Sequence, residues 1–132
     1  MNDPRPGPAR AGLLIYACDV ERVARFYEAV LGMQRRASDA KRVVLASSDA
    51  QLIIHALPPQ FRALAVAGSP AEPRLAAAIK PFYSVDDLAV AADAMREHGG
   101  ELFPEVWPGP GFRVRNGCDC EGNVIQLREW VS

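Results

Sequence analysis

The sequence has little of the residue chemistry on which several protein classes depend. Its 132 residues include only three cysteines and two histidines, and its 15 basic side chains are balanced by 16 acidic ones. Without a basic excess, a dedicated nucleic-acid-binding protein is not expected, because such proteins neutralise phosphates with clustered Lys and Arg. No apolar run approaches the roughly 20 residues of a membrane-spanning helix, so a membrane partner is not expected either.

The first ten residues contain no apolar core of the kind that a secretory signal requires. They read MNDPRPGPAR, a proline-rich stretch that predicts a loose tail over residues 1–10. We therefore expect a cytoplasmic protein whose thiols stay reduced. Cys118 and Cys120 could suggest a soft-metal site, but zinc sites usually have four ligands and wider spacing, so we favour two thiols near a turn.

The composition does provide a hydrophobic core. With 49% hydrophobic residues, the chain is not intrinsically disordered, and its length fits one domain or two small repeats that share a core. An apolar run over residues 11–17 predicts a strand, and Asp19 is placed to cap a helix that starts at Val20. Gly32 ends this helix, because glycine is common just beyond a helix terminus.

The same order of elements recurs in the second half of the chain. Residues 75–85 predict a strand, Asp86 or Asp87 a helix cap, and residues 88–98 a helix that a pair of glycines ends. A loop is expected over residues 104–111. The short strands expected after the helices are at residues 33–36, 42–46 and 51–56 in the first half, and at 101–103, 112–115 and 124–128 in the second.

These patterns predict an α+β fold of two tandem βαβββ units. The first unit covers residues 11–57, a proline-rich linker with a helical turn near residues 61–66 covers 58–74, and the second unit covers 75–132. One helix covers one face of each four-stranded sheet. The uncovered faces together form a half-closed curved sheet, and we call its hollow the cup. A concave sheet face of this kind is a natural ligand site.

Three segments of the sequence follow a known family pattern in order and at matching spacing. They are Asp19-Val20-Glu21-Arg22 with Phe26-Tyr27 and Val30-Leu31-Gly32; Val85-Asp86-Asp87-Leu88; and Asp119-Cys120-Glu121-Gly122-Asn123-Val124-Ile125-Gln126-Leu127. On these segments the chain resembles the vicinal oxygen chelate superfamily of glyoxalases, bleomycin resistance proteins and dioxygenases. The resemblance covers residues 12–129, with Cys120 where proline is usual.

The resemblance implies four inward strand positions at which metal-dependent members hold a divalent ion with His and Glu. In this sequence they fall at Gly12, Ile53, Lys80 and Gln126. Glycine and isoleucine offer no donor, an ammonium group repels a metal ion, and an amide oxygen is a weak ligand. We therefore expect neither a bound metal nor another cofactor, which argues against lyase and dioxygenase chemistry that needs metal-bound oxygen.

Strand alternation then predicts which side chains face the cup. His55 is either a hydrogen-bonded pocket residue or a ligand donor or general base. Lys80 pairs with a carboxylate such as Glu129 or Glu105, binds an anion, or forms a Schiff base. The expected cup-facing residues are Gly12, Leu14, Tyr16, Gln51, Ile53, His55, Lys80, Phe82, Ser84, Val124, Gln126 and Arg128.

Aromatic and cationic residues complete the predicted ligand site. Arg113 and Arg115 alternate with apolar neighbours and so share one face, which binds anions if it is the cup and is otherwise solvated. The predicted ligand-binding residues are His55, Lys80, Gln126, Tyr16, Phe82, Trp107, Arg113 and Arg115.

Three functions remain open at this point. We favour a metal-free protein that binds a small aromatic or anionic molecule in the cup. The alternatives are a metal-dependent glyoxalase-like lyase or dioxygenase, and a non-catalytic structural or regulatory protein. The resemblance also implies a homodimer, because two-unit members of the superfamily commonly build their clefts between subunits.

Overall fold

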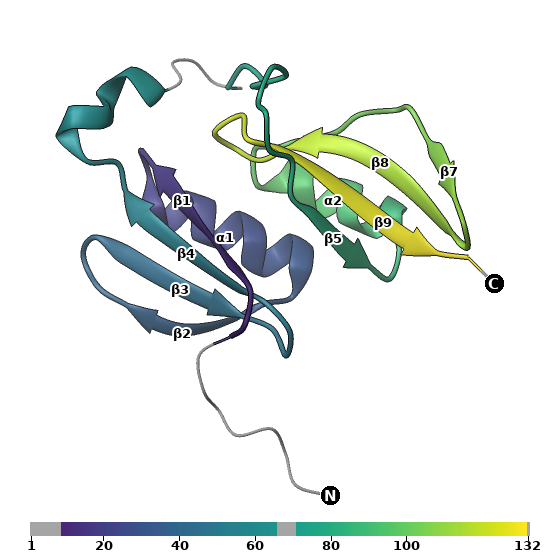
Figure 1. The fold of residues 1–132 in the computed structure, drawn as a ribbon, viewed down its shortest axis with the longest axis horizontal. Helices are drawn as coiled ribbons and strands as arrows, with labels where there is room; N and C mark the ends of the chain where they lie inside the picture. The colour runs from purple at the N-terminus through teal and green to yellow at the C-terminus, as the bar shows by residue number, and fades with distance from the viewer. Residues whose placement is uncertain (1–8, 66–70, 132) are drawn as a thin grey trace, which may run out of the picture.

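The computed structural model describes residues 9–65 and 71–131, which form two βαβ-type units side by side (Figure 1). Most of the predicted tail over 1–10, the middle of the predicted linker over 58–74, and the last residue of the second unit lie outside the described residues. In the described part of the linker, a 3-10 helix spans Pro59–Leu64.

The first unit has the predicted order of one strand, one helix and three strands. Its four-stranded sheet has the order β1-β4-β3-β2, in which β1 is parallel to β4 and the other neighbours are antiparallel. The elements are β1 (Gly12–Ala17), α1 (Val20–Leu31), β2 (Gln34–Ser38), β3 (Arg42–Ala46) and β4 (Gln51–Ala56).

The second unit repeats this plan with two departures from the prediction. The strand expected over residues 75–85 begins only at Phe82, because the chain turns near Leu75 and Pro81 has no N–H to donate to a ladder. The loop expected over 104–111 contains a short strand. The elements are β5 (Phe82–Val85), α2 (Leu88–Glu97), β6 (Glu101–Leu102), β7 (Trp107–Gly109), β8 (Phe112–Cys118) and β9 (Val124–Trp130).

Local capping explains why both helices form where the sequence predicts. The Asp19 carboxylate accepts a hydrogen bond from the backbone N–H of Arg22, and Gly32 ends α1 with a left-handed backbone at φ 67°. Asp87, rather than Asp86, caps α2 in the same way. The two helices have 12 and 10 residues, and no helix within the described ranges is long and apolar enough to cross a membrane.

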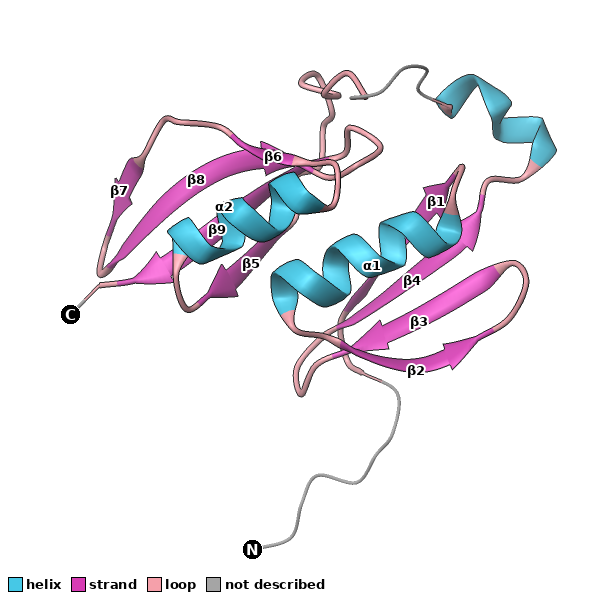
Figure 2. Ribbon diagram, turned by 180° about the vertical axis from the view of Figure 1, so that it is seen from behind, coloured by secondary structure: helices cyan, strands magenta, loops and turns pink. Residues whose placement is uncertain are grey.

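Both helices pack on the same side of the two sheets, so the opposite side stays open. Figure 1 shows the open side, and Figure 2 shows α1 and α2 next to each other on the covered side. One core runs through both units beneath the helices. Its fully buried side chains include Val23, Phe26, Tyr27, Leu45, Leu52, Ile54, Met95, Ile125 and Leu127.

Hydrogen bonds between the units fix their relative position. The Tyr27 hydroxyl of α1 donates to the buried carboxylate of Asp119, at 2.7 Å. The two carboxylate oxygens of Glu121, in the turn between β8 and β9, accept the backbone N–H groups of Cys18 and Asp19, each at 2.8 Å. The β8–β9 turn of the second unit therefore caps α1 of the first unit. These bonds also hold the open faces of the two sheets next to each other.

Candidate functional site

The open face of the first sheet is set by the alternation of β1. Ile15 and Ala17 are buried under the helix, whereas Leu14 and Tyr16 are exposed on the other side. The register places Gly12 opposite Gln51, Leu14 opposite Ile53, and Tyr16 opposite His55 on β4. The predicted orientation of these positions is therefore confirmed.

The open face of the second sheet is rich in aromatic side chains. On β5, Phe82 is 55% exposed, and it is opposite Gln126 of β9. Pairing between β8 and β9 extends this face. Its members are Phe82, Ser84, Phe112, Val114, Asn116, Gln126, Arg128 and Trp130, with Trp107 opposite Val114 on the edge strand β7.

Arg128 is the cation at the centre of this aromatic surface. Its guanidinium carbon lies 3.8 Å from the ring centroid of Phe82 and 5.0 Å from that of Phe112. Its Nε and one terminal nitrogen both donate to the Gln126 side-chain oxygen, at 3.1 Å. Within the described chain it has no carboxylate partner within 4 Å. The open face of the second sheet therefore carries a positive charge that no acidic side chain among the described residues neutralises.

Gln126 joins this cation to a second amide. Its Nε2 donates to the Asn116 side-chain oxygen at 3.3 Å while its own oxygen accepts from Arg128. The orientation of the Gln126 amide is therefore set from both ends. The result is a polar strip across the second sheet, bordered by aromatic rings.

The first sheet carries a separate aromatic group. The Tyr16 ring contacts His55 edge-on, with centroids 6.1 Å apart, and lies 5.6 Å from Phe61 of the 3-10 helix. The Nδ1 atom of His55 lies 2.7 Å from the backbone carbonyl oxygen of Ala56. This hydrogen bond fits the simpler of the two roles predicted for His55, and it leaves Nε2 available to a ligand.

Arg113 and Arg115 share one face, but that face is the helix-covered side and not the cup. Val114 is opposite the cup residue Arg128, so its two neighbours must point the other way. Arg113 is 3.7 Å from the Glu129 carboxylate, and the Arg115 Nε donates to the backbone carbonyl of Phe103 at 2.8 Å. Both residues are therefore removed from the ligand site.

Lys80 lies outside β5 in an exposed segment, so its ammonium group is not held on a strand as predicted. It has no ion pair with Glu105 or Glu129 in the described structure. Glu129 instead accepts the backbone N–H of Leu88 at the start of α2. By contrast, Trp107 is on the cup side as predicted, with half of its surface exposed.

The side chains at the four family ligand positions do not fit a metal ion. Gly12 has no donor, and a Cβ atom built there would lie 2.8 Å from the backbone oxygen of Gln51, so a longer side chain is excluded without movement of the strands. Ile53 is aliphatic, Lys80 is cationic, and Gln126 is already engaged by Arg128. The part of the chain that the structure describes contains no cluster of three His, Cys, Asp or Glu side chains able to hold a metal ion.

Arg128 and its neighbours Phe112 and Asn116 are outside the set of predicted ligand contacts. Strand alternation predicts the inward face for Arg128 without assigning it to the ligand site, and it assigns neither Phe112 nor Asn116 to that site. One feature of the sequence does point to Arg128: it follows Gln126 by two residues, so both side chains lie on the same face of a strand. The partners Phe112 and Asn116 depend on the register of β8, which the local sequence does not specify.

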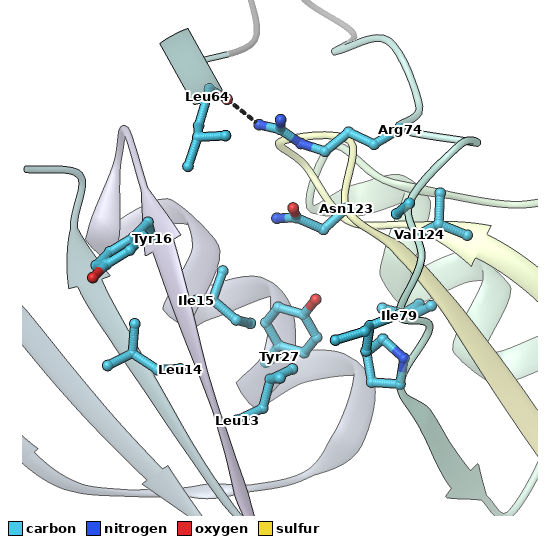
Figure 3. Close-up of a pocket in the computed structure, with 13 residues that line it drawn as sticks. Leu13, Leu14, Ile15, Tyr16, Tyr27, Leu64, Arg74, Ile79, Asn123 and Val124 are labelled. Carbon is cyan, nitrogen blue, oxygen red and sulfur yellow. Dashed lines mark hydrogen bonds between the residues drawn. The ribbon is translucent and has the colours of Figure 1, made fainter. Parts of the chain in front are cut away.

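A cavity of about 330 Å³ opens at the seam between the two units, beside the cup (Figure 3). Leu14 and Tyr16 of β1 belong to both the cup and this cavity. The other walls come from the segment before β5 and from the start of β9. The lining residues are Leu13, Leu14, Ile15, Tyr16, Tyr27, Leu64, Arg74, Ala77, Ile79, Pro81, Asn123, Val124 and Ile125.

Below the seam, burial keeps two thiols and a phenol protonated. Burial, reinforced by the Asp119 charge, raises the pKa of Cys118 from 9.0 to about 11, that of Cys120 to about 12, and that of Tyr83 from 10.0 to about 12. Neither thiol is a reactive thiolate at neutral pH. Both cysteines are free and buried. The carboxylate of Asp119 between them is occupied by four hydrogen-bond donors. Cys118 and Cys120 are therefore buried thiols near a turn.

The raised pKa values predict a loss of stability in alkali. Above pH 9 the unfolded chain releases protons that the folded chain keeps, so stability is complete below pH 9 and falls as pH rises toward 12. We expect the urea midpoint of unfolding to fall between pH 8.5 and 11, and to fall less steeply in Cys120→Ala. An equal slope in the variant and the parent protein would show that this thiol does not contribute.

Comparison with known proteins agrees with this geometry. A family model described as the Glyoxalase/Bleomycin resistance protein/Dioxygenase superfamily matches residues 11–127. No curated protein matches the chain. Among solved structures, a glyoxalase/bleomycin resistance protein/dioxygenase family enzyme from Burkholderia phytofirmans PsJN has a TM-score of 0.68 at 14% identity, over 94% of this chain and 100% of that one.

Two further solved structures share the fold at similarly low sequence identity. A hypothetical protein from S. aureus is 17% identical, with a TM-score of 0.64 over 93% of this chain and 95% of that one. The fosfomycin resistance protein FosX from Mesorhizobium loti is 16% identical, with a TM-score of 0.60 over 96% and 93%. At these identities the likeness concerns the fold alone.

Proposed function

Since the chain belongs to the Glyoxalase/Bleomycin resistance protein/Dioxygenase superfamily, we propose that it binds a small aromatic anion in its cup without the help of a metal ion. The observation that carries this proposal is Arg128. Its guanidinium carbon lies over the Phe82 ring, its guanidinium is held by Gln126, and no carboxylate of the described residues lies within 4 Å of it. A carboxylate or similar anion would neutralise this charge.

The surroundings of Arg128 favour a flat, partly apolar ligand. Phe82, Trp107 and Trp130 are each at least half exposed on the same face, and Phe112 packs edge-on against Trp130 at 5.5 Å. Burying such rings against an aromatic ligand is favourable. The amides of Gln126 and Asn116 add donors and acceptors beside the cation, so they would orient the polar groups of the ligand.

Benzoate binding to Arg128→Gln tests this proposal. Because a hydrogen bond to a charged group contributes about 1.5–3 kcal/mol, we expect the variant to bind benzoate at least about tenfold more weakly than the parent in isothermal titration calorimetry. Benzyl alcohol, which has the ring without the charge, should bind both proteins alike. Arg113→Gln, on the helix-covered face, is the matched control and should bind benzoate as the parent does.

Two results would contradict the proposal. The first is benzoate affinity that Arg128→Gln leaves unchanged. The second is a stoichiometric divalent ion found by elemental analysis of the purified protein, because that ion would require ligands other than the residues at the four family positions. Such a result would favour the metal-dependent lyase or dioxygenase alternative.

We further propose that the protein acts in the cytoplasm as a homodimer. A second copy that covers the exposed aromatic side chains on the open face would remove their apolar surface from water, which favours association. Light scattering that gives the mass of a single chain would refute the dimer.

A further inference from the structure

We propose that the seam cavity is a second ligand site, separate from Arg128, which takes a short-chain aliphatic carboxylate with Arg74 as its anion partner. The cavity measures about 330 Å³, at the lower end of the range of small-molecule pockets. This site does not depend on the function proposed for the cup, although Leu14 and Tyr16 border both.

The walls of the cavity are mainly aliphatic. Leu13, Leu14 and Ile15 line it from β1, and Ile79 and Val124 face them from the second unit (Figure 3). This surface differs from the aromatic face around Arg128. It suits an alkyl chain, whose transfer from water is favourable in proportion to the apolar area that it buries.

Arg74 provides the positive charge at the mouth of the cavity. Its backbone N–H donates to the carbonyl of Gly122 at 2.8 Å, which ties this part of the chain to the β8–β9 turn. Its side chain then extends across the mouth, where one terminal nitrogen donates to the backbone carbonyl of Leu64 (Figure 3). The position of the guanidinium is therefore determined by contacts at both ends.

The guanidinium of Arg74 is not neutralised by the described chain. Within residues 9–65 and 71–131, no carboxylate lies within 4 Å of it, and its buried Nε–H has no hydrogen-bond partner. A buried donor without a partner is unfavourable, and a charged acceptor relieves that cost. A small shift of the side chain would present this edge to a carboxylate in the cavity.

Asn123 provides a second polar group. It lines the cavity on the side of the second unit (Figure 3), and its Nδ2 donates to Asp119 at 2.9 Å. Arg128 is five residues further along β9, which corresponds to roughly 16 Å at about 3.3 Å per residue. Arg74, which is tied to Gly122, and Arg128 are therefore anchored at well-separated points of the backbone.

The test is isothermal titration of the full chain with hexanoate, using hexanol as the uncharged probe. We expect Arg74→Gln to weaken hexanoate binding about tenfold, Arg74→Lys to weaken it less because the positive charge is kept, and hexanol to bind all three proteins alike. Ile79→Trp provides an independent test, because Ile79 is 77% exposed and a larger ring can fill the cavity without disturbing the core. This variant should weaken both probes.

The variants also separate this proposal from that for the cup. Arg128→Gln should leave hexanoate binding unchanged, and Arg74→Gln should leave benzoate binding unchanged. Hexanoate that fails to bind, or that binds Arg74→Gln and Ile79→Trp as tightly as it binds the parent, would overturn the seam site and leave the cup proposal standing. Loss of benzoate binding in Arg74→Gln would also overturn it, since one site would then serve both anions.

Discussion

Replacing Asp119 by alanine is expected to destabilise the folded protein by about 2–6 kcal/mol. The Asp119 carboxylate is 1% exposed and accepts hydrogen bonds from the Tyr27 hydroxyl, the Glu121 backbone N–H, and both the backbone and side-chain nitrogens of Asn123. The Tyr27 and Glu121 donors are buried, and each costs about 1–3 kcal/mol when left without a partner. Urea unfolding monitored by circular dichroism measures the loss.

The control for this prediction is Asp93→Ala. Asp93 also pairs with a cation, Arg96 at 3.0 Å, but both side chains are about 70% exposed. Exposed pairs of this kind contribute about 0–1 kcal/mol. Tyr27→Phe, which removes a single hydrogen bond of the network, should fall between the two. A loss below 1 kcal/mol in Asp119→Ala would show that water or rearranged side chains replace the carboxylate.

Glu121→Ala is expected to cost about 1.5–3 kcal/mol and to loosen the connection between the two units. Each carboxylate oxygen of Glu121 accepts one backbone N–H at the start of α1, where a negative charge also interacts favourably with the helix. Hydrogen bonds to charged groups contribute about 1.5–3 kcal/mol each. The two donors, on Cys18 and Asp19, are exposed, so water can partly replace the carboxylate. The expected loss is therefore that of about one such bond.

Hydrogen exchange locates the effect of Glu121→Ala. The amides of Cys18 and Asp19 should lose protection in the variant, and those in β3 should not. Glu97→Ala, at an exposed position near the end of α2, should change the free energy of unfolding by less than about 0.5 kcal/mol. If Glu121→Ala unfolds at the same urea concentration as Glu97→Ala, the bonds to α1 do not contribute.

The helices were predictable from the sequence because their signals are local. Asp19 and Gly32 bracket α1 within a few residues of its ends, and the chemistry of capping does not depend on distant contacts. The strand before α2 was less predictable. The run from Leu75 to Pro81 is apolar enough for a strand, yet Ala77 donates to the carbonyl of Arg74 in a turn and the ladder starts later.

The site was only partly predictable, because faces and registers are set by distant pairing. Alternation correctly put Arg113 and Arg115 on one side, but only the pairing of Val114 with Arg128 shows which side that is. Arg74 had no signal at all. It lies in an irregular segment, where no periodicity assigns a direction to a side chain, and its position depends on a bond to the β8–β9 turn.

Gly12 leaves no room for a side chain at the first of the four ligand positions that the family resemblance implies. The carbonyl oxygen of Gln51 lies 2.8 Å from the point where a Cβ atom of residue 12 would stand, and it belongs to the backbone of a strand paired with β1 over six residues. A histidine at position 12 therefore requires the backbone of β1 or β4 to shift. A single substitution to histidine is therefore expected to destabilise the fold before an imidazole could reach a metal ion, so a metal site engineered here has to begin with the β1–β4 pairing.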